Sequence, residues 1–171
     1  MHGIAGHTAG PRAETGRLSR SNRAADLVVL SHLRWTWVWQ RPQQLVSRFA
    51  AMRSRVGART WFVEEPETAD VFAPALRWEE LESVTRIWLA LPPTSDGLRP
   101  TFGSSGSEAY GDLVGGLLRS QGRPPAPDVL IYTPLAYETA QRLRPGRVGY
   151  DVMDDLASFA NAPEGLRLAH R

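Results

Sequence analysis

The sequence predicts an α/β fold, with a doubly wound, mostly parallel sheet and helices on both faces. Short apolar runs alternate with longer amphipathic segments from residue 26 onward, which is typical of strand–helix–strand units. Polar and aromatic residues gather where the apolar runs end, and open α/β sheets bind ligands at the carboxyl ends of their strands. The length of 171 residues suits one domain with a substantial core and is short for two.

The first part of the chain predicts a strand, a helix and a second strand. Residues 26–31, Asp-Leu-Val-Val-Leu-Ser, form a buried apolar run. Pro42 suits the first position of a helix over 42–56, and Gly57 can end that helix. Residues 60–63, Thr-Trp-Phe-Val, predict the second strand. The expected apolar face of the helix consists of Leu45, Val46, Phe49, Met52 and Val56.

The middle of the chain is less regular. Residues 71–91 have a mixed composition, in which 85–91 is the best strand, and Pro92 ends it because proline cannot join a central ladder. The segment 94–107 is rich in Gly, Ser and Pro, which predicts a mobile loop. Ser107 is expected to cap the next helix. That helix would present an apolar face of Tyr110, Leu113, Val114, Leu117 and Leu118.

The last part of the chain continues the alternation. Residues 128–132 predict a buried strand, 135–143 a short helix, and 148–152 a final strand. Parallel strands need such crossover helices between them. We therefore expect a Rossmann-like domain.

The chain divides into a tail and one domain. Residues 1–24 are rich in Gly, Ala, Ser, Thr and Arg without periodicity, and we expect them to be disordered. Residues 25–171 form the predicted Rossmann-like domain, and nothing like a second domain follows. The tail lacks the apolar core of a secretory signal, and no apolar run is long enough to span a bilayer. We expect a cytoplasmic protein without a transmembrane segment.

The composition excludes several kinds of site. Cysteine is absent, which excludes disulfides and thiolate metal sites, and the four histidines are too dispersed to predict a metal cluster. All 20 basic residues are arginine, and they intermingle with 18 acidic residues, so we expect no nucleic-acid footprint. No G-x-G-x-x-G or Walker pattern follows the first strand. We therefore expect neither a metal nor a cofactor.

The segment 35–42, Trp-Thr-Trp-Val-Trp-Gln-Arg-Pro, is the clearest candidate site. It joins the first strand to the first helix, and a helix amino terminus favours a phosphate. Tryptophans such as Trp35 and Trp37 can line a sugar or a base, while Arg41, beside Gln40, can reach a phosphate. The alternative is that the tryptophans only pack the helix on the sheet, since large aromatic residues are mostly buried.

Acidic residues accompany the second and the last predicted strand. Glu64 and Glu65 end the second strand, while Asp151, Asp154 and Asp155 lie in or just after the last one. In a parallel sheet they would share one rim with the tryptophan segment. Carboxylates there can act as general bases, hold a divalent metal or bind sugar hydroxyls. The alternatives are a solvated turn for the glutamates and a helix cap for the last two aspartates.

Five stretches carry a resemblance to a known family. Leu-Val-Val-Leu-Ser-His-Leu-Arg-Trp stands at 27–35, Trp-Gln-Arg-Pro-Gln-Gln-Leu at 39–45, and Phe-Val-Glu-Glu-Pro at 62–66. Tyr-Thr-Pro and Gly-Tyr-Asp-Val-Met-Asp-Asp follow at 132–134 and 149–155. In this order they resemble the start of bacterial glycosyltransferases of the GT-B superfold, over about residues 26–166.

The resemblance implies a two-domain enzyme that transfers a hexose from a nucleotide diphosphate sugar to a glycan or lipid-linked acceptor. Its amino-terminal domain would mainly hold the acceptor, while the carboxy-terminal domain, missing here, would make most donor contacts. The chain would then be the acceptor-side half, truncated before the donor domain. We expect it to turn over no nucleotide sugar alone. A separately encoded donor domain and peripheral association with a membrane are compatible with this interpretation.

The resemblance also implies roles for individual residues. Arg41 would lie near the diphosphate or the acceptor, Trp35 and Trp37 would be sugar platforms, and Asp151 and Asp154 would be polar contacts at the cleft. Three positions depart from the family pattern. Thr36 stands where an aspartate is usual, and Val152 and Asp155 stand where a cysteine and a glutamate are common. The first change removes a carboxylate, so no catalytic base is named.

Other functions remain open from the sequence. The chain can be a non-catalytic sugar-binding module, a relic fragment or half of a split enzyme. A regulatory flavodoxin-like domain is disfavoured because no aspartate ends the first strand. Tryptophans left exposed without a partner domain would promote self-association.

Overall fold

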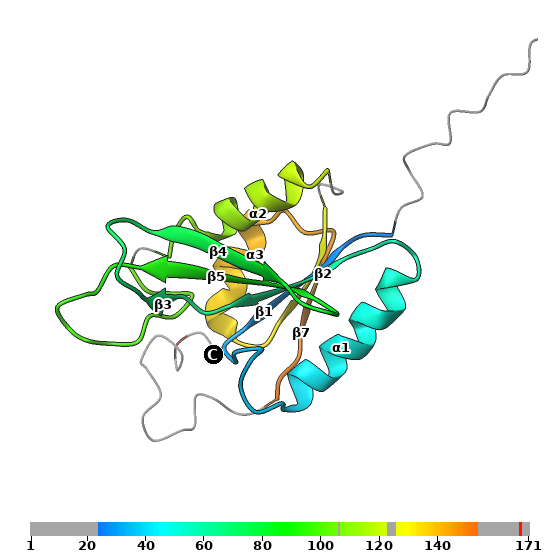
Figure 1. The fold of residues 1–171 in the computed structure, drawn as a ribbon, viewed down its shortest axis with the longest axis horizontal. Helices are drawn as coiled ribbons and strands as arrows, with labels where there is room; N and C mark the ends of the chain where they lie inside the picture. Colours follow the sequence, from blue (N-terminus) through cyan, green and yellow to red (C-terminus); the bar gives the residue numbers. More distant parts are fainter. Residues whose placement is uncertain (1–23, 106, 123–125, 154–167, 169–171) are drawn as a thin grey trace, which may run out of the picture.

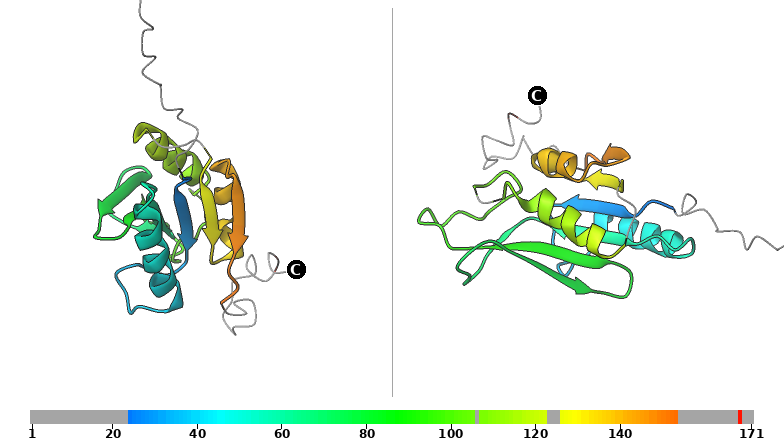
Figure 2. Two further views of the ribbon diagram at one scale, coloured as in Figure 1. Left: turned by 90° about the vertical axis from the view of Figure 1, so that its right-hand side faces the viewer. Right: turned by 90° about the horizontal axis from the view of Figure 1, so that it is seen from above.

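The computed structural model describes residues 24–105, 107–122, 126–153 and 168. The tail predicted for 1–24 lies outside these residues except for its last position, and so do the candidates Asp154 and Asp155. Within the described part, a seven-stranded sheet separates α1 on one face from α2 and α3 on the other (Figures 1 and 2). This arrangement confirms the predicted Rossmann-like fold class.

Apart from the additional strands β3 and β4, the elements follow the order expected from the sequence. The strands are β1 (Leu27–Ser31), β2 (Thr60–Glu64), β3 (Glu67–Thr68), β4 (Ala75–Glu80), β5 (Thr85–Leu91), β6 (Asp128–Ile131) and β7 (Arg147–Tyr150). The helices are α1 (Arg41–Ser54), α2 (Tyr110–Ser120) and α3 (Tyr137–Arg142), with a short 3-10 turn, η2 (Pro134–Ala136), before α3.

The centre of the sheet is parallel. β1 lies between β2 and β6, with Leu27 aligned to Thr60 on one side and to Asp128 on the other. β7 extends the sheet beyond β6, with Ile131 aligned to Tyr150. The carboxyl ends of these four strands therefore meet at one rim.

The other edge of the sheet contains a hairpin that the sequence pattern did not predict. β4 runs antiparallel to β5 along its length, from the pair Ala75–Ala90 to the pair Glu80–Thr85. Since β4 occupies one edge of β5, the parallel partners β2 and β3 share the other edge. β4 is half-exposed and polar, so it lacks the apolar run that marks the buried strands.

Alternation along the strands divides the core into two clusters. Val28 and Leu30 of β1 face α2 and α3, whereas Leu27 and Val29 face α1, because successive strand residues point to opposite faces. The larger cluster includes Phe102, whose ring stacks on that of Tyr110 at 5.8 Å between centroids. This contact anchors the loop before α2 on the sheet.

The predicted apolar face of α1 is only partly correct. Val46 and Ala50 are buried as a helical stripe requires, but Met52 and Val56 are exposed. The buried stripe passes through the polar Gln43 instead. The helix ends at Ser54 with Arg55 as its C-cap, so Gly57, with a φ of 73°, lies in the turn that follows and does not itself end the helix as predicted.

The predicted cap of α2 is wrong. The helix begins at Tyr110 after Ala109, which makes no side-chain cap hydrogen bond. The Ser107 hydroxyl instead donates to the Thr101 carbonyl at 3.0 Å, inside the preceding loop. Of the predicted face, Leu113 is exposed.

Candidate functional site

The loop 35–41, Glu64 and Asp151 lie at the carboxyl rim of the sheet, as the sequence predicted. Ser31 at the end of β1 is aligned with Glu64 at the end of β2, and Asp151 directly follows β7. The backbone N–H of Asp151 donates to the Ile131 carbonyl at 3.0 Å, which keeps it in register with the sheet.

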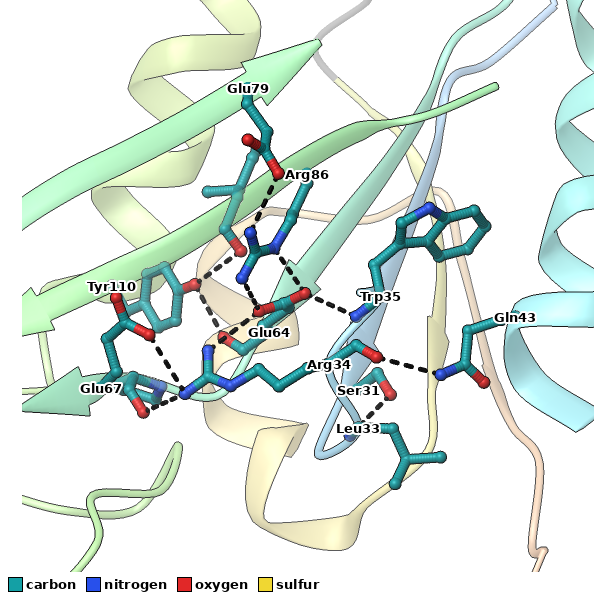
Figure 3. A network of polar contacts seen from close by, with 12 residues as sticks. Ser31, Leu33, Arg34, Trp35, Gln43, Glu64, Glu67, Glu79, Arg86 and Tyr110 are labelled. Carbon is teal, nitrogen blue, oxygen red and sulfur yellow. Dashed lines mark hydrogen bonds and ion pairs between the residues drawn. The ribbon is translucent and has the colours of Figure 1, made fainter. Parts of the chain in front are cut away.

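Glu64 is the centre of a buried polar network (Figure 3). Its side chain is fully buried, and one oxygen accepts the Trp35 backbone N–H at 2.7 Å. Arg86 donates to both carboxylate oxygens, at 2.7 and 3.0 Å, and Arg34 donates to one at 3.0 Å. The sequence suggested a solvated turn or a ligand contact here, whereas the observed contacts hold the start of the tryptophan loop.

The two arginines of the network are themselves anchored at their outer ends. Arg34 donates to the Pro66 carbonyl at 3.0 Å, and Arg86 donates to Glu79 at 2.9 Å. Burial lowers the pKa of Arg86, but the hydrogen bonds that Arg86 donates to Glu64 and Glu79, together with the charges of these carboxylates, outweigh burial and raise its pKa overall. Arg86 therefore keeps its charge at neutral pH.

Gln43 holds the other end of the loop. Its side chain is fully buried, and its amide donates to the Arg34 carbonyl at 3.0 Å. Its side-chain oxygen accepts the Gln40 backbone N–H at 3.1 Å. A buried amide whose oxygen and nitrogen are both hydrogen-bonded carries little penalty for burial. Gln43 can therefore occupy a buried position on α1, and its two hydrogen bonds hold the loop segment that leads to Arg41.

The three tryptophans of the loop have different surroundings. Trp35 is only 5% exposed and packs edge-on against Phe62, with ring centroids 4.9 Å apart. The ring of Trp39 contacts that of Trp35, with centroids 5.3 Å apart, and Trp39 is 49% exposed. Trp37 is 53% exposed. The Arg99 guanidinium lies 5.1 Å from the ring centre of Trp37. Trp35 therefore supports the loop, and Trp37 and Trp39 present ring surface to solvent.

Arg41 and Asp151 form an ion pair at the rim. The Arg41 Nη2 donates to the Asp151 Oδ1 at 3.0 Å, with side chains 63% and 17% exposed. The Tyr132 hydroxyl lies near this pair. Burial, together with the Asp151 carboxylate, raises the pKa of Tyr132 to about 12, although Arg41 acts in the opposite direction. Tyr132 is therefore a neutral hydroxyl at physiological pH.

Glu65 is a buried carboxyl group directly after β2. It is 7% exposed, and its backbone N–H donates to the Ser31 carbonyl at 3.1 Å. Burial raises the pKa of Glu65 to about 7, although Arg99 and Arg34 act in the opposite direction. A carboxyl group that titrates near neutral pH can exchange a proton with a bound substrate.

This titration predicts a pH-dependent stability. An unfolded glutamate releases its proton near its ordinary pKa of 4.5, whereas folded Glu65 keeps it up to about 7, so the folded state holds more protons in that window. The stabilisation is complete below the unfolded pKa and is lost as pH rises through the folded one, by about 3 kcal/mol. Glu65→Gln should not show this loss.

Urea unfolding at about pH 5 and about pH 8 tests this expectation. The stability of Glu65→Gln relative to the native chain should increase between the two pH values. Glu82→Gln is the matched control, because Glu82 is exposed in the turn between β4 and β5. A difference between Glu65→Gln and the native chain that stays constant with pH would contradict the prediction.

The structure brings together some of the predicted site residues. Arg41 meets Asp151, and the Trp35 backbone meets Glu64. The sequence analysis missed Arg34, Arg86 and Tyr132, whose partners are distant along the chain, and it gave Trp39 no role of its own. The pattern Trp-x-Trp-x-Trp could have indicated Trp39 as a third candidate. Alternate positions in an irregular loop need not share one environment, so each tryptophan had to be considered separately.

Within the part of the chain that the structure describes, no group of three or more His, Cys, Asp or Glu side chains is placed to hold a metal ion. Among the described helices, none has both the length and the apolar character needed to cross a bilayer.

Comparison with protein-family models and with curated proteins gives no match. Among solved structures, one that resembles this chain is described as trehalose-6-phosphate from E. coli bound with UDP-2-fluoro glucose. It is 16% identical, with a TM-score of 0.37, over 74% of this chain and 32% of that chain. An α,α-trehalose 6-phosphate synthase from Burkholderia multivorans is 15% identical, with a TM-score of 0.36, over 74% and 33%.

The chain thus spans about a third of the length of these two structures. At such identities and TM-scores, the likeness carries no argument about activity.

Proposed function

We propose that the chain is the acceptor-side, Rossmann-like half of a glycosyltransferase. The reaction would be transfer of a hexose from a nucleotide diphosphate sugar to a glycan or lipid-linked acceptor. The observation that carries the proposal is the composition of the rim. Exposed Trp37 and Trp39 lie in the loop that leads to Arg41, and Arg41 pairs with Asp151 at the carboxyl ends of the parallel strands. Aromatic surface with a few fixed polar groups is typical of small-ligand sites.

The candidate residues divide into those that contact substrate and those that support them. Trp37 and Trp39 are the proposed sugar platforms, and Gln40, Arg41 and Asp151 supply the proposed polar contacts. Trp35 and Glu64 act through the loop, because both are buried and bonded to each other. Asp154 and Asp155 stay predictions from the sequence. Glu65 is the rim carboxyl group suited to proton transfer.

Replacing Arg41 tests the proposal. We expect Arg41→Ala to weaken binding of a hexose or a nucleotide sugar about tenfold, because a hydrogen bond from a charged donor contributes about 1.5–3 kcal/mol. Tryptophan fluorescence during titration with methyl hexosides and with UDP-glucose reports the binding. Arg48→Ala is the matched control, since Arg48 is exposed on the same helix.

The outcomes of this experiment separate the functional classes. Binding of both ligand types that depends on Arg41 supports the glycosyltransferase half. Binding of free sugars without any nucleotide sugar favours a sugar-binding module. If neither ligand type binds the native chain, the proposed function is wrong.

A further inference from the structure

Three side chains from three elements converge beside the tryptophan loop. Arg41 is the first residue of α1, Tyr132 directly follows β6, and Asp151 directly follows β7. The Tyr132 backbone N–H donates to the Leu30 carbonyl at 2.9 Å, so its position is fixed by the sheet. The three groups are therefore placed by the rigid part of the fold.

The charges of Arg41 and Asp151 compensate each other. Their atoms lie 3.0 Å apart, so an added anion meets a positive and a negative charge at similar distances, and the two contributions largely cancel. If a phosphate bound the Arg41 guanidinium in place of Asp151, the mostly buried Asp151 carboxylate would lose its counter-charge, which is unfavourable. The pair is thus a poor site for a phosphorylated ligand.

A neutral hydroxyl group does not disturb this pair. A hydroxyl donates one hydrogen bond and accepts others, a guanidinium has several N–H donors and a carboxylate has two oxygens. Neighbouring hydroxyls of a sugar can therefore accept from Arg41 and donate to Asp151 while the ion pair stays intact. Binding then requires no separation of charge.

The Tyr132 hydroxyl adds a third polar group to this site. It is buried and makes no hydrogen bond of good geometry within the described residues, although the Asp151 carboxylate is close enough to raise its pKa through charge and a weak hydrogen bond. Buried polar groups are nearly always paired in folded proteins. Both Asp151 and Arg41 act on the electrostatics of this hydroxyl, so it is adjacent to the pair and available to the same ligand.

We propose that Arg41, Asp151 and Tyr132 form a subsite for a neutral sugar ring, and that Asp151 excludes phosphorylated sugars from it. This inference rests on the proposed function and names the substrate class of the same site. It also revises the expectation that Arg41 contacts a diphosphate, because the charge of Arg41 is already compensated.

The test compares neutral and phosphorylated hexoses on the full chain. The probes are the methyl glycosides of glucose, galactose and mannose and the 6-phosphates of the same hexoses, measured by ligand-observed NMR. The native chain should bind at least one methyl glycoside about tenfold more tightly than the matching 6-phosphate. UDP-glucose is titrated separately, because it reports on the proposed function.

Variants assign the selectivity to individual side chains. Asp151→Asn should weaken binding of the neutral sugar and tighten binding of the 6-phosphate about tenfold, because it leaves the positive charge of Arg41 uncompensated. Adding Arg41→Ala to Asp151→Asn should remove that gain. Tyr132→Phe should weaken binding of the neutral sugar but should not change the preference for the neutral sugar over its 6-phosphate. Asp112→Asn is the matched control, since Asp112 forms an exposed ion pair with Arg142 at the same 3.0 Å.

The result that overturns the inference is distinct from failure of the proposed function. Native chain that binds hexose 6-phosphates as tightly as methyl glycosides contradicts the subsite but leaves a sugar-binding rim. An Asp151→Asn variant with unchanged selectivity does the same. Loss of all binding, to hexoses and to UDP-glucose alike, overturns both proposals.

Discussion

Replacing Glu64 with glutamine should lower the free energy of unfolding by about 3–5 kcal/mol. The carboxylate is fully buried and is the shared partner of Arg34 and Arg86. A neutral amide would leave two largely buried guanidinium groups with only the half-exposed carboxylates of Glu79 and Glu67. Breaking a buried pair on one side is far more costly than losing an exposed one. Since small domains are stable by only about 5–15 kcal/mol, this single change removes much of the total.

Urea unfolding of Glu64→Gln measures this loss, and Glu67→Gln is its control. Glu67 lies 3.9 Å from the same Arg34 but is 41% exposed, so its removal should cost less than about 1 kcal/mol. The loop should also respond, because Glu64 accepts the Trp35 backbone N–H. We expect faster hydrogen exchange at Trp35 in the variant. Equal stabilities for the two variants would show that the buried network contributes little.

Replacing Gly111 with alanine should destabilise the protein by about 2 kcal/mol, although alanine favours helices. Gly111 lies where α2 packs against α3, and an added Cβ would be 2.6 Å from the Thr139 carbonyl oxygen and 2.7 Å from the Arg142 Cβ. Both obstacles belong to the adjacent helix and neither is the end of a flexible side chain. α3 would have to move away from α2.

For Gly116, in the same helix, we expect replacement by alanine to increase stability rather than to lower it. An added Cβ there would approach no atom closer than the Arg119 Nη2, at 4.0 Å. Gly116→Ala should therefore stabilise the protein by up to about 1 kcal/mol, the difference in helix propensity. Thermal melting of both variants measures the contrast. Two shifts of the same sign would mean that the close approach of α2 and α3 does not restrict position 111.

The buried face of α1 shows why the apolar pattern alone was insufficient to predict which residues are buried. Val46 follows the apolar pattern, but Met52 and Val56 are exposed, and Gln43 takes a buried position. Gln43 is stable there because it bonds the backbone of Arg34 and Gln40, in a loop whose shape no local pattern specifies. The hairpin of β4 was missed for a related reason. Its residues are half-exposed, so the pairing with β5 leaves little trace in the apolar pattern.

Local patterning was sufficient for the order of the buried strands and the helices and for the rim at which the candidate residues gather, because strand and helix periodicities are properties of neighbouring residues. It was not sufficient for the function of each polar side chain. Glu64 and Arg34 are 30 residues apart, and Arg41 and Asp151 are 110 apart. Whether a carboxylate is a structural counter-charge or a rim contact depends on which distant arginine the folded chain brings to it. That pairing, and with it the exposure of Trp39 rather than Trp35, was decided by tertiary structure.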